Sequence, residues 1–283
     1  MNKDEKFGRA EAPGRSEDAR LLTGKGRFTA DLDFPDMVHA VFVRSPYGHA
    51  DIKNIDLAEA TAALGVVGVF TADDFPNIHS IPCARVILGR DGRELVRPDR
   101  HPLAKGRVRH IGECVAVVIA ETKALAEDAA DLVMIDYAPL EAVARPERAI
   151  KDSAPQLWPE APNNILLDWD TGDKDAVDIA FKKAKHRVRL DTRNNRLMVS
   201  ALEPRAAIGR LEAGRLTLYA CSQGVMTMHT QLSKHALKLD DPSNLRIVSG
   251  DVGGGFGMKT QAYPEYPVIL RAAERLKRPV KWV

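Results

Sequence analysis

The stretch from residue 113 to 140 constrains the fold of this chain more than any other. Residues 114–120 form an unbroken apolar run of strand length, which is typical of a fully buried strand. Thr122 then stands where the N-cap of a helix is expected, and apolar residues recur at helical spacing after it. A second strand pattern follows at 133–140. A strand, a helix and a strand in this order predict a small α/β layer.

The rest of the chain carries further strand and helix patterns, separated by Gly-rich and Pro-rich turns. The expected strands are 38–45, 50–57, 65–72, 186–193, a hairpin over 206–222 that turns at 212–214, and 245–250. The expected helices are 58–65, 173–186, 227–239 and one that starts at 264–265 and ends near 277. The fold class is therefore mixed, α+β or α/β.

The domain organisation follows from length and from one change in composition. A chain of 283 residues suggests two domains, and the proline-rich stretch 143–164 is the expected linker between them. We therefore expect an N-terminal arm over 1–19, extended because it is charged and aperiodic. A first domain over 20–142 and a second over 165–283 complete the prediction.

Composition excludes several classes of protein. Lys and Arg number 41 against 39 Asp and Glu, and a balance this close argues against a nucleic-acid-binding surface. No apolar run approaches the length of a membrane span, and the polar first twenty residues do not read as a signal peptide. The three scattered cysteines fit neither a disulfide framework nor a zinc ribbon. A cytoplasmic protein is expected.

A glycine-rich loop is the strongest candidate site. Residues 251–259 read DVGGGFGMK, with four glycines in five positions directly after an expected strand. Such a backbone can approach a ligand closely and offer bare N–H groups. A Walker A loop needs glycine immediately before the lysine, and a Rossmann fingerprint needs a third glycine where Met258 stands, so both phosphate-loop patterns fail. A tight loop without a ligand is the equally weighted alternative.

Two shorter segments offer further candidate residues. Gln223 lies between an expected strand and an expected helix and can both donate and accept a hydrogen bond. Taken alone, it is more typical of a solvated turn. Glu203 and Arg205 flank a proline and could form an ion pair that braces a site, although surface pairs are usually weak. The histidines at 186, 229 and 235 show no metal-ligand spacing.

The order of several blocks resembles one known family, the molybdenum hydroxylases (xanthine dehydrogenase, aldehyde oxidase and carbon monoxide dehydrogenase). The blocks that resemble its α/β hammerhead domain are 20–31, 39–46, 112–121 and 126–130. The blocks that resemble the start of its molybdopterin-binding domain are 202–205, 222–224, 252–257 and 278–282. The resemblance runs from about residue 14 to the end. It implies a hammerhead domain over 20–142 and an incomplete molybdopterin-binding domain over 165–283.

The resemblance also implies a cofactor and its contacts. Gln223 would donate a hydrogen bond to an oxo ligand of molybdenum, while Gly254, Gly255, Phe256 and Gly257 would cradle the metal end of the cofactor. The metal would be held by the dithiolene of molybdopterin, so no side chain is expected to bind it directly. A cytosine dinucleotide form of the cofactor is one option. Iron–sulfur clusters and FAD would lie on partner subunits.

The implied reaction is oxidation of an aldehyde or an N-heteroaromatic compound with water as the oxygen source. Thr260 stands where purine-specific members have a glutamate, which argues against a purine substrate. The family's general-base glutamate lies far beyond the glycine loop, near the end of a longer chain, and Glu265 does not match its motif. No catalytic residue is therefore expected on this chain, which should be inactive without a second molybdopterin-binding chain.

Three functional hypotheses follow. The first is a split enzyme, in which this chain works with a second molybdopterin-binding chain, an iron–sulfur subunit and a FAD subunit. The second is a non-catalytic truncated remnant or assembly module of the same family. The third is an unrelated nucleotide-binding protein. The strand pattern at 278–283 is expected to be an exposed edge that another polypeptide covers.

Overall fold

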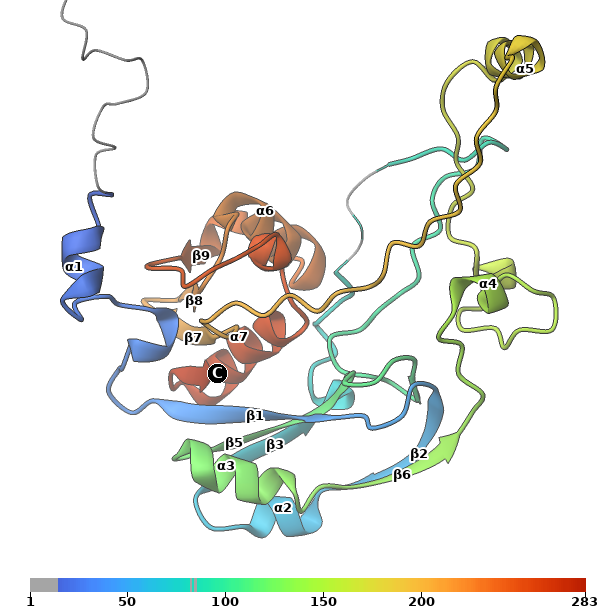
Figure 1. Ribbon diagram of the computed structural model, residues 1–283. Helices are drawn as coiled ribbons and strands as arrows, with labels where there is room; N and C mark the ends of the chain where they lie inside the picture. Colours follow the sequence, from blue (N-terminus) through green and yellow to red (C-terminus); the bar gives the residue numbers. More distant parts are fainter. Residues whose placement is uncertain (1–14, 82, 84–85) are drawn as a thin grey trace, which may run out of the picture.

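The computed structural model describes residues 15–81, 83 and 86–283, and its strands form two sheets (Figure 1). The larger sheet has seven strands in the order β3-β5-β1-β10-β7-β8-β9, and the smaller has three in the order β4-β2-β6. The strands are β1 (Val38–Arg44), β2 (Ala50–Asp56), β3 (Val66–Thr71), β4 (Arg107–Val108), β5 (Cys114–Ala120), β6 (Met134–Pro139), β7 (Ala207–Glu212), β8 (Arg215–Ala220), β9 (Leu245–Val248) and β10 (Val280–Trp282).

The helices are mostly short and lie on the faces of the large sheet or away from it. They are α1 (Asp18–Leu22), α2 (Ala58–Ala62), α3 (Lys123–Ala130), α4 (Pro146–Ala149), α5 (Lys174–Lys183), α6 (Val225–Thr230), continued by a π-helical segment (Gln231–Ala236), and α7 (Glu265–Leu276). Among the described residues, none of these helices is long and apolar enough to cross a membrane.

The strand–helix–strand unit forms, but it does not make one layer. β5 is buried at every residue and pairs antiparallel with both β1 and β3. Thr122 caps α3 as predicted, because its hydroxyl accepts a hydrogen bond from the Leu125 N–H at 3.3 Å. β6, however, pairs with β2 in the small sheet. The prediction of a single α/β layer was therefore wrong; β6 alternates exposed and partly buried residues, which suits a sheet with one open face.

The last strand is not an edge. In β10, Val280 pairs with Val38 of β1 on one side and with Gly209 of β7 on the other. The expectation of an exposed edge covered by another polypeptide was wrong, because neighbouring strands of this chain already occupy both sides of β10. Trp282 at its end packs edge-on against Phe42, with ring centroids 5.8 Å apart. β10 thus joins the N-terminal and C-terminal strands into one sheet.

The C-terminal half matches its sequence patterns closely. β7 and β8 form the predicted hairpin, and its turn residues Ala213 and Gly214 both have positive φ, as two-residue hairpin turns require. β9 adds in parallel to β8. α6 with its π-helical continuation and α7 occupy the two predicted helical segments. α7 packs on β7 and β10, which puts its N-terminal end near the strands of the N-terminal half.

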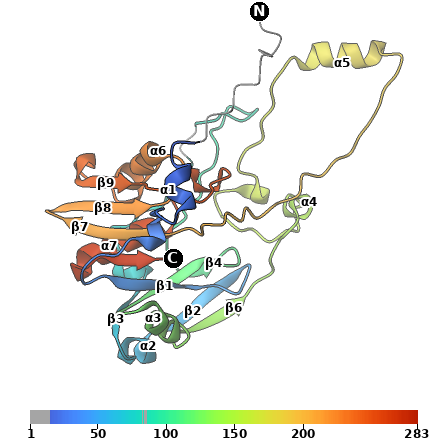
Figure 2. The ribbon, with the colours of Figure 1, turned by 60° about the vertical axis from the view of Figure 1, so that its left-hand side comes forward.

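One long segment leaves the body of the molecule. Residues 143–203 run outward through α4 and α5 and return, as both views show (Figures 1 and 2). The predicted helix is present as α5, capped by the Asp173 carboxylate, and every residue of it is exposed. The predicted strand at 186–193 is absent, and no strand among the described residues pairs with this segment. Val188 and Leu190 are 92% and 80% exposed.

The N-terminal arm was predicted to be extended over 1–19. Residues 1–14 lie outside the described residues. Residues 18–22 form α1, so an extended arm is wrong for that part. The charged residues there are compatible with one helical turn, because Asp18 lies in the first turn and Arg20 in the last, where each suits the helix dipole.

Candidate functional site

The glycine loop begins at an anchored residue. Asp251 follows β9, and its carboxylate receives two hydrogen bonds from the Arg20 guanidinium, the longer at 2.6 Å. The backbone N–H of Arg27 adds a third at 2.7 Å. The hydrogen bonds from Arg20 are the main reason that the pKa of Asp251 lies well below its usual range. The N-terminal block of the chain therefore fixes the start of the loop.

The loop itself needs glycine for two separate reasons. Gly254 and Gly257 have φ of 105° and 80°, in the region that favours glycine. At Gly255 the obstacle is contact, because a Cβ atom there would overlap the side-chain amide of Gln223. Phe256 also has a positive φ, 50°, and its side chain is 75% exposed. The loop is thus pressed against Gln223 while Phe256 faces outward.

Gln223 is bound to this loop through only one end of its amide. It follows β8, and its Oε1 accepts hydrogen bonds from the backbone N–H groups of Gly257 at 3.0 Å and Lys259 at 3.3 Å. Its Nε2 has no hydrogen-bond partner among the described residues. The five residues singled out from the sequence, Gln223, Gly254, Gly255, Phe256 and Gly257, therefore lie together, with an amide N–H₂ free to donate.

A buried ion pair supports the loop from the protein interior. The Lys259 ammonium is fully buried and donates to Oε2 and to the backbone oxygen of Glu203, at 2.8 and 2.9 Å. The same Oε2 accepts the Gly253 N–H at 2.8 Å. Glu203 therefore does not pair with Arg205. Sequence reasoning missed the role of Lys259; its signal was a lysine two residues after the last glycine of the loop.

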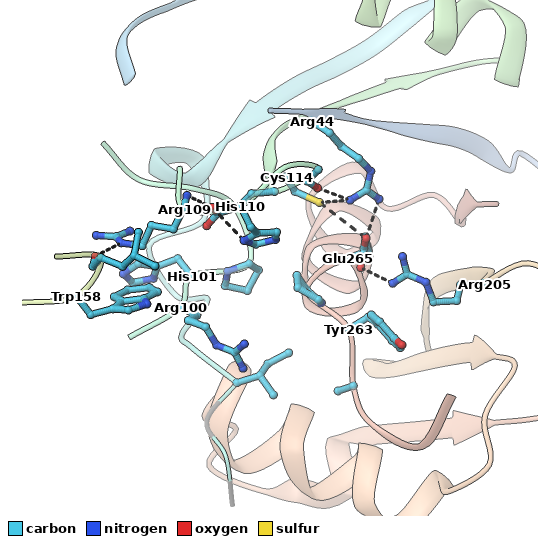
Figure 3. A pocket seen from close by; sticks show the side chains of 17 residues that line it. Arg44, Arg100, His101, Arg109, His110, Cys114, Trp158, Arg205, Tyr263 and Glu265 are labelled. Carbon is cyan, nitrogen blue, oxygen red and sulfur yellow. Dashed lines mark hydrogen bonds and ion pairs between the residues drawn. The ribbon is translucent and has the colours of Figure 1, made fainter. Parts of the chain in front are cut away.

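A second group of charged residues surrounds the N-terminus of α7 (Figure 3). The Glu265 carboxylate is only 2% exposed and lies 2.7 Å from Arg44 and 3.5 Å from Arg205. Cys114 lies against the same carboxylate, and burial raises the pKa of its thiol to about 12. The Arg205 guanidinium also stacks over the ring of Tyr263 at 4.0 Å. Nothing in the sequence spacing links these residues, which come from four separate segments.

The histidines singled out from the sequence do not belong to this site. His229 Nε2 lies 3.1 and 3.2 Å from the backbone oxygens of Pro242 and Leu245, which ties α6 to the start of β9. His186 lies on the outlying segment. In the described part of the chain, no three His, Cys, Asp or Glu side chains are grouped so that they could hold a metal ion.

Two family models match the chain in succession. The hammerhead domain model, described as "Aldehyde oxidase and xanthine dehydrogenase, a/b hammerhead domain", matches residues 23–141. The model described as "Molybdopterin cofactor-binding domain" matches residues 157–283. The second match contains the glycine loop and Gln223, and the first contains Arg44 and Cys114.

Individual proteins agree with these matches. The chain is 35% identical to the nicotine 6-hydroxylase large subunit of Paenarthrobacter nicotinovorans over 95% of its own length and 32% of that protein. It is 34% identical to the carbon monoxide dehydrogenase large chain of Hydrogenophaga pseudoflava over 94% of its length and 34% of that chain. Quinoline 2-oxidoreductase of Pseudomonas putida 86 has a similar structure, with a TM-score of 0.82, 31% identity, and coverage of 95% of this chain and 34% of that one. The chain spans about a third of the length of these relatives.

Proposed function

The chain belongs to the molybdenum hydroxylase family, and we propose that it holds the metal end of molybdopterin in a multi-subunit enzyme of that family. The observation that carries this proposal is that only the oxygen of the Gln223 side-chain amide is hydrogen-bonded. Its oxygen is bound by the glycine loop, while its nitrogen is free to donate beside the exposed loop backbone. Oxo and dithiolene groups are electron-rich acceptors, so this donor set fits the cofactor.

Each residue of the loop has a distinct role in the proposed site. Gln223 Nε2 would donate to an oxo ligand, and the hydrogen bonds to Oε1 would keep the amide from flipping. Gly254, Gly255, Phe256 and Gly257 supply close backbone, and no side chain of this chain binds the metal directly. When bound, the molybdenum centre supplies the redox chemistry. Lys259 and Glu203 hold the loop in place from the protein interior.

The proposed reaction is oxidation of an aldehyde or an N-heteroaromatic compound, with water as the source of oxygen. Relatives named nicotine 6-hydroxylase and quinoline 2-oxidoreductase favour the N-heteroaromatic class. Electrons would leave through iron–sulfur clusters and FAD on partner subunits. A general-base glutamate would come from a second molybdopterin-binding chain, so this chain alone would be inactive. A cytosine dinucleotide form is one option for the cofactor, and we further propose a cytoplasmic location.

The outlying segment is the surface that we propose for the second chain. Apolar side chains along this segment are exposed, and exposed apolar surface can mark interaction sites. The exposed apolar residues on it are Val177, Ile179, Phe181, Val188, Leu190, Leu197, Met198 and Leu202. The unpaired strand pattern at 186–193 would gain its hydrogen bonds by pairing with a strand of the partner.

Metal content tests the proposal. The chain is purified with the subunits that accompany it in its natural host. The molybdenum content of the complex is then measured by inductively coupled plasma mass spectrometry. We expect about one molybdenum per chain in the wild-type complex and a loss of most of it in Gln223→Ala, because the oxo ligand loses its donor. Asn77→Ala, which removes an exposed amide elsewhere, should keep the metal. A metal-free wild-type complex would instead favour a non-catalytic remnant or assembly module.

A further inference from the structure

The helical unit that follows Gln223 contacts the chain just beyond the glycines. α6 begins at Val225, directly after Gln223 and Gly224, and continues as a π-helical segment from Gln231 onward. It is the one π-helical segment in the described part of the chain, and such segments are frequent at functional sites. α6 packs on residues 258–260, so the unit and the end of the glycine loop are neighbours.

Both ends of the Gln231 side-chain amide bind the residues that follow this turn. Its Oε1 accepts the backbone N–H of Ala262 at 2.8 Å, and its Nε2 donates to Oε1 of Gln261. A backbone N–H can only donate, so the hydrogen bond from Ala262 determines which way the amide faces. Gln231 is only 6% exposed, and Ala262 packs against the main core. Without the amide, the Ala262 N–H would lose its protein acceptor at that place.

The groups that fix Gln223 lie only a few residues earlier. The N–H groups of Gly257 and Lys259 donate to Gln223 Oε1, and the Lys259 backbone oxygen accepts the Gln223 N–H at 2.9 Å. A short 3₁₀ turn, Met258–Thr260, connects them to the residues that Gln231 binds. The helical unit therefore holds one stretch of backbone at two points, through Gln223 at its start and through Gln231 at the other end.

A further contact makes this stretch move as one piece. The Tyr263 hydroxyl donates to the Met258 backbone oxygen at 2.6 Å, which ties the residue after Ala262 back to the turn. The Thr260 hydroxyl donates to the Gly257 backbone oxygen at 2.9 Å and closes the turn itself. A displacement at 261–263 would therefore displace the turn, and with it the two N–H groups that hold Gln223 Oε1.

We propose that Gln231 is a positioning residue for the Gln223 amide. It holds residues 261–262, so that Gly257 and Lys259 keep Gln223 Oε1 bound and leave Nε2 free to donate. Gln231 acts through this backbone and not by contact with the cofactor. Its effect on the amide is a property of this chain alone, whereas its importance for molybdenum rests on the proposed function.

Amide hydrogen exchange in the full-length chain, measured by NMR, tests the positioning without any cofactor. Gln231→Met keeps a side chain of similar length but has no amide. We expect the N–H groups of Gly257 and Lys259 to exchange about tenfold faster in it, because the turn that carries them is loosened. Gln231→Glu should restore slow exchange. A protonated glutamate offers the same donor and acceptor as the amide, and an ionised one accepts from Ala262 and from a rotated Gln261 amide.

A destabilised variant elsewhere separates positioning from general loosening. Val118→Ala leaves a cavity at β5, in a core cluster separate from the one against which Ala262 packs. Under conditions in which every variant is folded, it should leave exchange at Gly257 and Lys259 as in the wild type. Unchanged exchange in Gln231→Met would overturn the proposal, as would an equal increase in Val118→Ala or in Gln231→Glu.

Molybdenum content then distinguishes this inference from the proposed function. In the complex purified from the natural host, Gln231→Met should lose most of the metal and Gln231→Glu should keep it. A metal-free wild-type complex would refute the proposed function, while the exchange result would still decide whether Gln231 positions the amide. Full retention of molybdenum in Gln231→Met, with a metal-loaded wild type, would overturn the role of Gln231 and leave the proposed function intact.

Discussion

At the residue scale, Lys259 is the side chain on which the glycine loop most depends. Its ammonium is 0% exposed and Glu203 is 7% exposed, so the charges compensate each other in the interior. In Lys259→Met the Glu203 carboxylate would stay buried without its cation. We expect the free energy of unfolding, measured in urea, to fall by about 3–5 kcal/mol.

A matched control separates this effect from the loss of any lysine. Lys174 pairs with Asp178 on the surface of α5, where both side chains are more than half exposed. Lys174→Met should change the free energy of unfolding by less than about 0.5 kcal/mol, because exposed pairs contribute little. Equal unfolding energies for the two methionine variants would show that the Lys259 pair does not stabilise the loop.

The three cysteines should differ sharply in reactivity. Cys83 is exposed, whereas Cys114 and Cys221 are buried, and burial raises the pKa of Cys114 to about 12. Only the thiolate reacts with iodoacetamide, so a group with a raised pKa stays protonated and inert at pH 8. Mass spectrometry should find Cys83 alone modified in the native protein, and all three modified in guanidinium chloride. Rapid labelling of Cys114 in the native state would contradict the packing around Glu265.

Single residues were predicted from the sequence with uneven success. The glycine loop and Gln223 could be singled out as candidates, because glycine clusters and strand-end polar residues are local signals. The charged groups around Glu265 could not, since Arg44, Cys114 and Arg205 meet it only through the tertiary fold. For the same reason, the sequence suggested a pair between Glu203 and Arg205, whereas each is bound to a more distant partner.

At the element scale, the packing of α7 on β7 depends on a close approach of the two backbones at Gly209. A Cβ atom at Gly209 would lie 2.7 Å from the backbone oxygen of Ile269. Because the clashing atom belongs to the backbone, no side-chain movement could relieve the overlap. Gly209→Ala should therefore push α7 away from the sheet and lower the free energy of unfolding by about 1–3 kcal/mol. Gly224→Ala is the control, because its Cβ would meet only ordinary contacts near 3.5 Å. Equal melting temperatures for the two variants would contradict this packing.

Element boundaries were largely predictable, but pairing was not. Apolar runs and caps identified β5, α3, the β7–β8 hairpin and α7, since these depend on local periodicity. The sequence could not tell that β5 and β6 enter different sheets, or that β10 inserts between β1 and β7. Those choices depend on contacts between segments that are far apart in the sequence, which periodicity does not encode.

At the scale of the whole molecule, one sheet holds together two stretches that match different family models. β1 belongs to the first match and β7 to the second, and β10 bonds to both. The core cluster likewise contains residues from both, among them Phe42, Ile119, Leu218 and Ile269. The connecting segment at 143–203 contributes little to that core, so its covalent continuity is not what keeps the two stretches together.

Limited trypsin digestion tests this organisation. The residues from 182 to 196 offer seven lysines and arginines on exposed backbone without strand pairing, so the first internal cuts should fall there. The two fragments should still elute together in gel filtration, because β10 of the C-terminal fragment pairs with β1 of the N-terminal one. Binding of the proposed second chain should slow cleavage, since it would cover the same residues. Separation of the fragments under native conditions would refute a shared sheet, and first cuts within β1 or β5 would refute the exposed segment.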